Sequence, residues 1–197
     1  MTGIEHVEIA AGRWQLRPPV ESEAADALAM LVDPLTAQWY PADVTDQDSA
    51  AAWCLRGADW STGNHATFSV LDATSGRLVG NVSLWGVDPA GLTASVGYRT
   101  APWARGQGVA PAAVDAVTGW AFGALGLERV ELPHRVANPA SCRVAQKCGY
   151  LLEGVLRQEY RDDDGVRWDC HLHARLAADP PMSIDPPMSA DPPADAG

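Results

Sequence analysis

The chain has 197 residues, 47% of them hydrophobic, which suits one domain with a substantial core. Its formal net charge of −11 argues against general nucleic-acid binding, which requires a basic surface. The sequence contains no run of about 18 apolar residues, so we expect neither a spanning helix nor a membrane partner.

Hydrophobic periodicity and turn residues predict alternating strands and helices along the chain. We expect strands over residues 14–17, 67–71, 78–85, 92–99, 129–135, 152–160 and 166–175, and helices over 21–32, 46–58, 111–122 and 140–148. Residues 38–41 are expected to form a loop, and Arg-Asp-Asp-Asp-Gly at 161–165 is typical of a hairpin turn. Strands outnumber helices, and helices separate the central strands. The pattern therefore predicts an α+β fold with a mixed sheet and helices on its faces.

Both ends of the chain differ from this central region. Residues 1–11 carry no basic-then-apolar export pattern, and we expect a flexible segment there. Residues 178–197 contain an imperfect Asp-Pro-Pro repeat, and paired prolines block helices and sheet ladders. We therefore expect a disordered proline-rich tail, whose removal leaves cofactor binding unchanged, and a folded domain over 12–177.

The cysteines and histidines predict no metal site. The four cysteines lie far apart, at Cys54, Cys142, Cys148 and Cys170. Cys142 and Cys148 fall on roughly opposite faces of one predicted helix, so free buried thiols in a reducing cytoplasm are expected. His171 and His173 share one strand face, a spacing that can bind a metal. The pattern supplies no third ligand, and strand packing is the favoured interpretation.

A glycine-bearing segment, Arg105-Gly106-Gln107-Gly108-Val109-Ala110, stands between a predicted strand and a predicted helix. Backbone N–H groups at a helix start have no intrahelical partner and favour anions, so this turn can seat a phosphate or pyrophosphate. Pro111 suits a first helical turn. The segment lacks the lysine of a triphosphatase loop and the third glycine of a dinucleotide fingerprint. Alone, it is equally compatible with an ordinary turn.

A second cluster at 138–150 reads Asn-Pro-Ala-Ser-Cys-Arg-Val-Ala-Gln-Lys-Cys-Gly-Tyr. With it, the chain resembles the GNAT superfamily of acyl-CoA-dependent N-acyltransferases. Arg105, Gly108 and Ala110 match the fixed positions of that family's pyrophosphate loop. The second cluster resembles the Asn-x-x-Ser-x-x-x-x-x-Lys-x-Gly-Phe signature of the RimJ/RimL branch, with Tyr150 in place of Phe. The resemblance spans roughly residues 12–176 and implies a mostly antiparallel central sheet with helices on both faces.

The resemblance implies a cofactor site. The strand before the loop would splay from the next one, and the pantetheine arm would lie in that gap. Asn138 matches a pantetheine contact, although an Asn-Pro pair equally suits a helix N-cap. The expected cofactor-binding residues are Val96, Gly97, Tyr98, Arg99, Arg105, Gly106, Gln107, Gly108, Val109, Ala110, Asn138, Ser141, Arg143 and Lys147.

Catalytic roles are implied at three positions, Ser141, Glu159 and Tyr160. Many family members have a tyrosine that acts as the general acid for the leaving thiolate, where this chain has Ala145. Ser141 is therefore the candidate hydrogen-bond donor to the leaving sulfur. Its hydroxyl is also compatible with a second helix cap. Glu159 and Tyr160 are candidate bases, but a strand alternates faces, so only one of them should point inward. For Glu159, a solvated surface position is the favoured interpretation. Ala112 and Ser95 replace acids that are usual in the branch.

On the acceptor side, Trp39 and Tyr40 occupy a loop that borders the acceptor groove in the family. Trp103 either lines the cofactor mouth or covers the sheet edge. The resemblance implies acetyl transfer from acetyl-CoA, or another acyl-CoA, to a protein N-terminal or small-molecule amine, by direct attack in a ternary complex. It implies no metal, a cytoplasmic location and compatibility with a homodimer. Two alternatives remain: an acyl-CoA sensor with little activity, and an enzyme that uses a larger donor such as succinyl-CoA.

Overall fold

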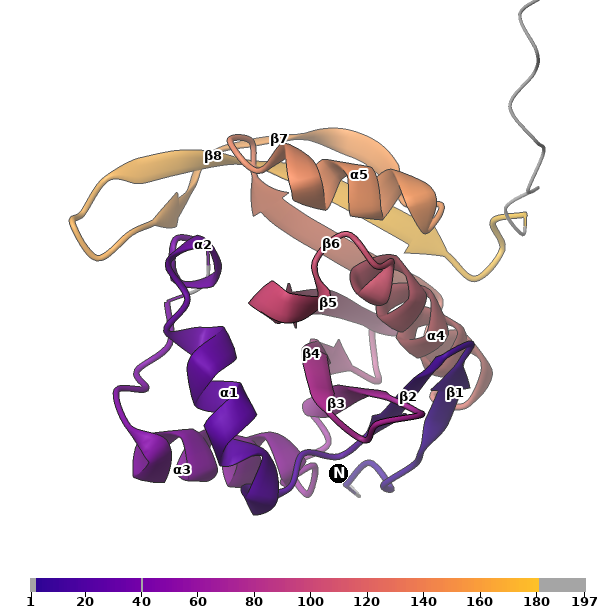
Figure 1. Cartoon of the computed structure of the whole chain (residues 1–197). Helices are drawn as coiled ribbons and strands as arrows, with labels where there is room; N and C mark the ends of the chain where they lie inside the picture. The colour runs from indigo at the N-terminus through magenta and orange to yellow at the C-terminus, as the bar shows by residue number, and fades with distance from the viewer. Residues whose placement is uncertain (1–2, 40, 181–197) are drawn as a thin grey trace, which may run out of the picture.

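The computed structural model describes residues 3–39 and 41–180, which are organised around one eight-stranded sheet (Figure 1). Its strands follow the order β1-β2-β3-β4-β5-β6-β8-β7. The bounds are β1 Ile9–Ala11, β2 Trp14–Arg17, β3 His65–Asp72, β4 Leu78–Asp88, β5 Thr93–Thr100, β6 Arg129–Arg135, β7 Leu151–Arg161 and β8 Arg167–Leu176. Every neighbouring pair is antiparallel except β5–β6, which is parallel. The predicted α+β class with a mixed, mostly antiparallel sheet is confirmed.

Helices cover both faces of the sheet (Figure 1). The helical segments are the 3-10 turns Glu21–Glu23 and Pro102–Ala104 and the α-helices α1 Ala24–Leu31, α2 Pro34–Ala37, α3 Gln47–Ala58, α4 Val109–Gly123 and α5 Pro139–Lys147. Helices α1 and α3 pack with Leu78 and Leu71 in one core, whereas α4 packs with Val79 and Val130 in the other. Leu78 and Val79 are neighbours on β4, so the alternation of a strand places them in opposite cores.

Two short elements were not expected from the sequence. Residues 9–11, which we expected to be flexible, instead form β1 and pair with β2, so that expectation is wrong for these residues. Helix α2 begins after Asp33, whose side chain accepts a hydrogen bond from the backbone N–H of Thr36 at 3.0 Å. Such short segments carry too few residues to show a period.

The tyrosine that replaces phenylalanine in the second motif is accommodated by one hydrogen bond. Tyr150 is 2% exposed, and its hydroxyl lies 2.6 Å from Oγ1 of Thr118 on α4. Burial raises the pKa of Tyr150 above its usual range, so this hydroxyl stays protonated. The pair links the end of α5 to α4 without leaving a buried oxygen unsatisfied.

Strands β5 and β6 separate toward the loop that follows β5. Thr93, Ala94 and Ser95 pair with Arg129, Val130 and Glu131, and the described residues show no pairing between the two strands beyond that point. Residues 96–100 of β5 therefore lie beside a gap between β5 and β6, outside the ladder that joins the two strands. This gap is the splay that the family resemblance implied.

The expected tail at 178–197 lies almost entirely outside the described residues, which end at 180. Among the described helices, none combines the length and apolar character needed to cross a membrane.

Candidate active site

Two clefts meet at the gap between β5 and β6. The first, of about 480 Å³, lies between α2, residues 104–111 and α5; we call it the donor cleft because most residues expected to bind the acyl donor line it. The second, of about 470 Å³, lies between β4, β5, β6 and the β7–β8 hairpin; we call it the acceptor cleft because the two candidate bases line it. Both clefts are lined by Trp39, Tyr98, Arg99 and Asn138. The two clefts therefore lie next to each other along this shared boundary.

Most residues expected to bind the cofactor lie around the donor cleft. Its lining includes Tyr98, Arg99, Arg105, Gly106, Gly108, Val109, Ala110, Asn138, Ser141, Arg143 and Lys147. Val96 and Gly97 line the acceptor cleft instead. Gln107 belongs to neither cleft of the described structure: its side-chain amide donates to the Trp103 carbonyl at 3.0 Å, and its backbone N–H donates to Ala104.

The donor cleft ends at the start of α4. Gly106 and Gly108 have φ of +77° and +80°, a left-handed conformation that favours glycine. Gly108 is the N-cap, and the N–H of Ala112 makes the first intrahelical bond, to the Gly108 carbonyl at 3.2 Å. The N–H groups of Val109 and Ala110 precede that bond, and glycine has no side chain to occupy them. The helix dipole makes this end attractive to an anion.

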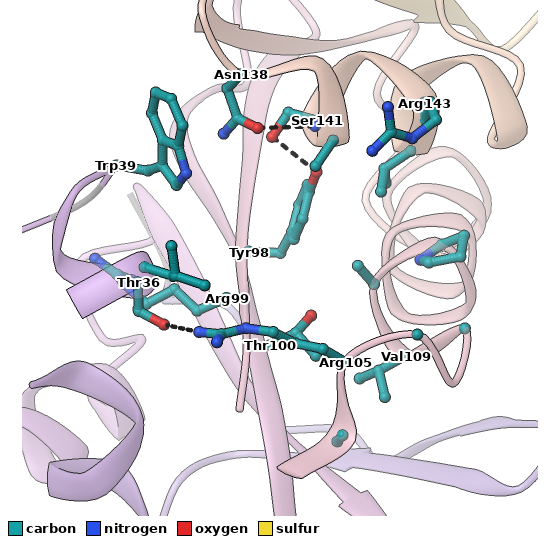
Figure 2. A pocket seen from close by; sticks show the side chains of 18 of the residues that line it. Thr36, Trp39, Tyr98, Arg99, Thr100, Arg105, Val109, Asn138, Ser141 and Arg143 are labelled. Carbon is teal, nitrogen blue, oxygen red and sulfur yellow. Dashed lines mark hydrogen bonds between the residues drawn. The ribbon is translucent and has the colours of Figure 1, made fainter. Parts of the chain in front are cut away.

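Basic side chains flank the same end of the cleft. Arg105 forms an ion pair with Asp33, the N-cap of α2, and donates to Thr36 Oγ1 at 3.0 Å (Figure 2). The hydrogen bond from Arg105 holds the pKa of Asp33 below its usual range, so the pair is charged at neutral pH. Arg143 and Lys147 are exposed on α5 at the other wall. The cleft therefore suits a ligand with several phosphates.

Three polar side chains meet at the start of α5 (Figure 2). Asn138 is the N-cap, and its Oδ1 accepts from the Ser141 N–H at 3.1 Å. The hydroxyl of Tyr98 on β5 donates to Ser141 Oγ at 3.0 Å. Asn138 and Ser141 are 6% and 5% exposed. Asn138 thus caps α5, as one of the two interpretations expected. It also lines both clefts, so its side chain can contact a ligand as well.

The two candidate bases both line the acceptor cleft. Glu159 and Tyr160 are neighbours on β7, yet both belong to its lining. The β7–β8 register shifts between Leu156 and Tyr160, and Gln158 has φ of +54°. Residues 157–159 stand opposite Asp169 alone, and this irregularity interrupts the two-residue period beside both candidates. That only one of the two side chains points inward stays a prediction.

Aromatic side chains surround an arginine in the acceptor cleft. The Arg135 guanidinium carbon lies 3.9 Å from the Tyr160 ring centre and 5.9 Å from that of Trp39. Trp39 thus reaches both clefts, whereas Tyr40 lies outside the described residues. Trp103 donates its indole N–H to the Leu78 carbonyl at 2.9 Å, and it is absent from the lining of the donor cleft.

The histidine pair of β8 has further neighbours that the sequence did not reveal. His134 on β6 lies opposite His171 and stacks on His173, with ring centres 5.2 Å apart. Cys142 on α5 approaches with its Sγ 3.6 Å from His173 Nε2, and it is half-buried rather than buried as expected. We call these four residues the His–Cys cluster. Burial lowers the pKa of His134 and of His173, so both imidazoles are neutral at physiological pH.

Sequence reasoning missed four groups in and beside the two clefts: the Tyr98 hydroxyl, Arg135, Thr36 and His134. Tyr98 and Ser141 are 43 positions apart, and no local pattern indicates that their hydroxyls meet. Arg135 and His134 fall at the end of a strand beside an expected cofactor contact. Only the divergence of β5 from β6, itself predicted from the family resemblance, could have pointed to that end.

A family model described as an acetyltransferase (GNAT) domain matches residues 13–151. The chain therefore belongs to the GNAT acetyltransferase family.

Relatives named for ribosomal-protein acetylation support the RimJ/RimL branch. The ribosomal-protein-serine acetyltransferase of Escherichia coli is 33% identical over 51% of this chain and 55% of its own length. The "Probable N-acetyltransferase YjcK" of Bacillus subtilis is 35% identical over 53% and 57%. The match thus spans little more than half of these curated relatives. The structure of Mycobacterium smegmatis RimJ in complex with CoA-disulfide is 26% identical, with a TM-score of 0.73 and 90% coverage of both chains.

Proposed function

We propose that this protein transfers an acetyl group from acetyl-CoA to a primary amine by direct attack in a ternary complex. The observation that carries the proposal is the meeting of two clefts at the β5–β6 gap, with Tyr98, Arg99 and Asn138 on their common boundary. Such an arrangement holds donor and acceptor side by side. It turns a bimolecular reaction into an intramolecular one.

In the donor cleft, the diphosphate of the cofactor sits on the N–H groups at the start of α4. Arg105 and the exposed pair Arg143 and Lys147 add positive charge around it. The pantetheine arm then extends through the gap between β5 and β6, beside residues 96–99. The solved relative from Mycobacterium smegmatis holds a CoA derivative, which supports this class of ligand.

The reaction forms a bond between the amine nitrogen and the thioester carbon, and it breaks the bond from that carbon to sulfur. A backbone N–H near residues 97–99 polarises the carbonyl. Because the Tyr98 hydroxyl donates to Ser141 Oγ, the Ser141 hydrogen is available to another acceptor. Ser141 donates that hydrogen bond to the departing thiolate, which finally takes a proton.

The attacking amine must lose a proton on the acceptor side. Glu159, with Tyr160 beside it, is the candidate base in that cleft. An α-amine, with a pKa of about 7.7–8.0, is already partly neutral at pH 7, so ordered water can suffice for it. A lysine amine, near ~10.4, requires more help. The name of the Escherichia coli relative makes protein N-terminal amines the first acceptors to test.

Release of CoA thiol tests the proposal. The protein is incubated with acetyl-CoA and, in separate reactions, with a peptide bearing a free N-terminus, an N-terminally blocked lysine peptide and small amines. We expect thiol release that depends on the acceptor, together with binding of acetyl-CoA in calorimetry. No heat of binding by the folded protein contradicts the proposal. Binding without turnover instead identifies an acyl-CoA sensor, and faster turnover with succinyl-CoA identifies a larger donor.

A further inference from the structure

The His–Cys cluster is a feature that acyl transfer does not require. His134 on β6 and His171 and His173 on the neighbouring strand β8 meet Cys142, which projects from α5. The four candidate ligand atoms, one from each side chain, all lie within 4.8 Å of one another. The consecutive elements β6 and α5, together with the later strand β8, thus bring three imidazoles and one thiol close together.

Two of the imidazoles already carry the outer hydrogen bond that is usual for metal-binding histidines. Nδ1 of His134 lies 2.9 Å from the Arg135 carbonyl, and Nδ1 of His173 lies 3.4 Å from the Tyr150 carbonyl. A carbonyl can only accept, so each holds the imidazole hydrogen on Nδ1 and leaves the lone pair on Nε2. Metal-binding histidines are oriented in this way, with the other ring nitrogen donating to a carbonyl or carboxylate.

Within the described structure, two buried nitrogens of the cluster have no hydrogen-bond partner: Nε2 of His134 and Nδ1 of His171. His134 is only 4% exposed, and an unsatisfied buried polar atom is costly. A hydrogen bond from the Cys142 thiol to His173 Nε2 accounts for the 3.6 Å contact between those two atoms only. It leaves Nε2 of His134 and Nδ1 of His171 without a partner, whereas a cation between the four side chains gives every one of these nitrogens a partner.

We propose that the cluster is a closed zinc site formed by His134, Cys142, His171 and His173. Tetrahedral bonds of about 2.0–2.3 Å to nitrogen and sulfur separate neighbouring ligand atoms by roughly 3.3–3.6 Å. The contact between Cys142 Sγ and His173 Nε2 already has this length, at 3.6 Å, and the widest separation must shorten by about 1 Å. Imidazole and thiolate ligands suit zinc, and four protein ligands leave no open position for substrate.

The role of such a site follows from its place in the fold. Cys142 directly follows Ser141, so a metal bond at Cys142 ties the first turn of α5 to β6 and β8. That turn carries the Asn138 cap and the Ser141 hydroxyl on the donor side. The zinc is therefore structural, and it holds α5 in place without taking part in acyl transfer.

Cobalt substitution tests the ligand set independently of any activity. Full-length, tag-free protein is treated with a chelator, titrated with Zn²⁺ or Co²⁺, and examined by metal analysis and absorption spectroscopy. We expect one metal per chain, the visible bands of tetrahedral cobalt, a thiolate-to-cobalt charge-transfer band, and displacement of cobalt by zinc. Less than one site per chain, an octahedral spectrum, or a spectrum without the thiolate band overturns the proposal. So does saturation by Cu(I) without measurable zinc binding.

Variants then assign the thiolate. Cys142→Ser should abolish the charge-transfer band and weaken zinc binding at least tenfold. Cys54→Ala, which changes a buried cysteine in the opposite core, is the matched control and should bind like the wild type. An unchanged band in Cys142→Ser overturns the four-ligand assignment. If either variant fails to fold, the cobalt spectrum and metal stoichiometry of the wild-type protein still test whether the site binds one tetrahedral metal ion through a thiolate.

Discussion

At the scale of single residues, the hydroxyl groups of Tyr98 and Ser141 have different roles because of the direction of the hydrogen bond between them. Tyr98 donates and Ser141 accepts, so only Ser141 keeps a hydrogen to offer at the boundary between the clefts. The backbone N–H of Ser141, in contrast, is fixed by the Asn138 cap and does not depend on the side chain. Substitutions can therefore separate the chemistry from the structure of this turn.

Ser141→Ala should lower turnover by roughly 10²-fold, the lower end of the range for a proton donor, and leave acetyl-CoA affinity nearly unchanged. Tyr98→Phe removes the donor to Ser141 but not the Ser141 hydrogen, so its loss should be smaller, about tenfold or less. Steady-state thiol release and calorimetry measure the two effects. Full activity in Ser141→Ala would remove this hydroxyl from the mechanism.

Glu159→Gln should slow acetylation of a lysine peptide more than that of an N-terminal α-amine. The lysine amine holds its proton more tightly and needs a base, whereas the α-amine is partly neutral. Tyr160→Phe retains the ring beneath Arg135 and is the matched comparison. The ratio of kcat/KM values for the two peptides, followed from pH 6 to pH 9, is the readout. An unchanged ratio would show that Glu159 does not accept the proton.

Thiol reactivity should follow burial. Burial raises the pKa of Cys54 to about 11 and that of Cys148 to about 12, so at pH 8 about one thiol in 10³ and one in 10⁴ is ionised. The thiolate fraction grows as the pH rises toward these pKa values. Alkylation of the folded, metal-free protein at pH 8, read by peptide mass spectrometry, should therefore label half-buried Cys142 first. Equal labelling of Cys148 would contradict this ordering.

At the scale of elements, the structure marks where sequence patterns are sufficient and where they fail. The strand Trp14–Arg17 was predicted with its observed bounds, because its alternating buried positions and flanking turn are local features. Helix α4 begins two residues earlier than expected, since Gly108 in a left-handed conformation caps it before Pro111. The bulge in β7 depends on pairing with β8, and no pattern within β7 reveals it. That bulge decides how Glu159 and Tyr160 face the acceptor cleft.

The start of α4 offers a matched pair of glycine substitutions. Gly108→Ala places a Cβ on a residue with φ of +80°, where the cost is conformational because no atom lies within 4 Å of that Cβ. The loop should rearrange, and acetyl-CoA affinity should fall at least tenfold. Gly119→Ala, on the exposed side of the same helix and also without a close neighbour, should leave affinity unchanged.

The control variant, Gly119→Ala, should also change the stability of the protein. Alanine in a helix interior is favoured over glycine by about 0.5–1 kcal/mol, so Gly119→Ala should raise the free energy of unfolding by that amount. Urea denaturation measures it. Equal affinities in the two variants would contradict the diphosphate seat at this helix start.

At the scale of the whole molecule, the fold class and the donor site were accessible from sequence for one reason. Their determinants are runs of neighbouring residues: hydrophobic periods, a glycine loop and an Asn-x-x-Ser signature. The acceptor cleft and the His–Cys cluster are assembled from elements far apart in the chain, such as Trp39 with Tyr160 and Cys142 with His173. Such contacts depend on which strands are neighbours, and no single segment of the sequence determines the strand order.

Removal of the residues after 180 tests whether the described part of the chain carries the complete donor site. Every residue that lines the two clefts falls between positions 35 and 170. A chain that ends at Pro180 keeps all of them, together with the backbone bond from Asp179 to Leu176 after β8. We expect acetyl-CoA affinity and the free energy of unfolding to match those of the full chain, measured by calorimetry and urea denaturation. A fall in affinity of more than threefold, with stability unchanged, would mean that the tail reaches the donor cleft.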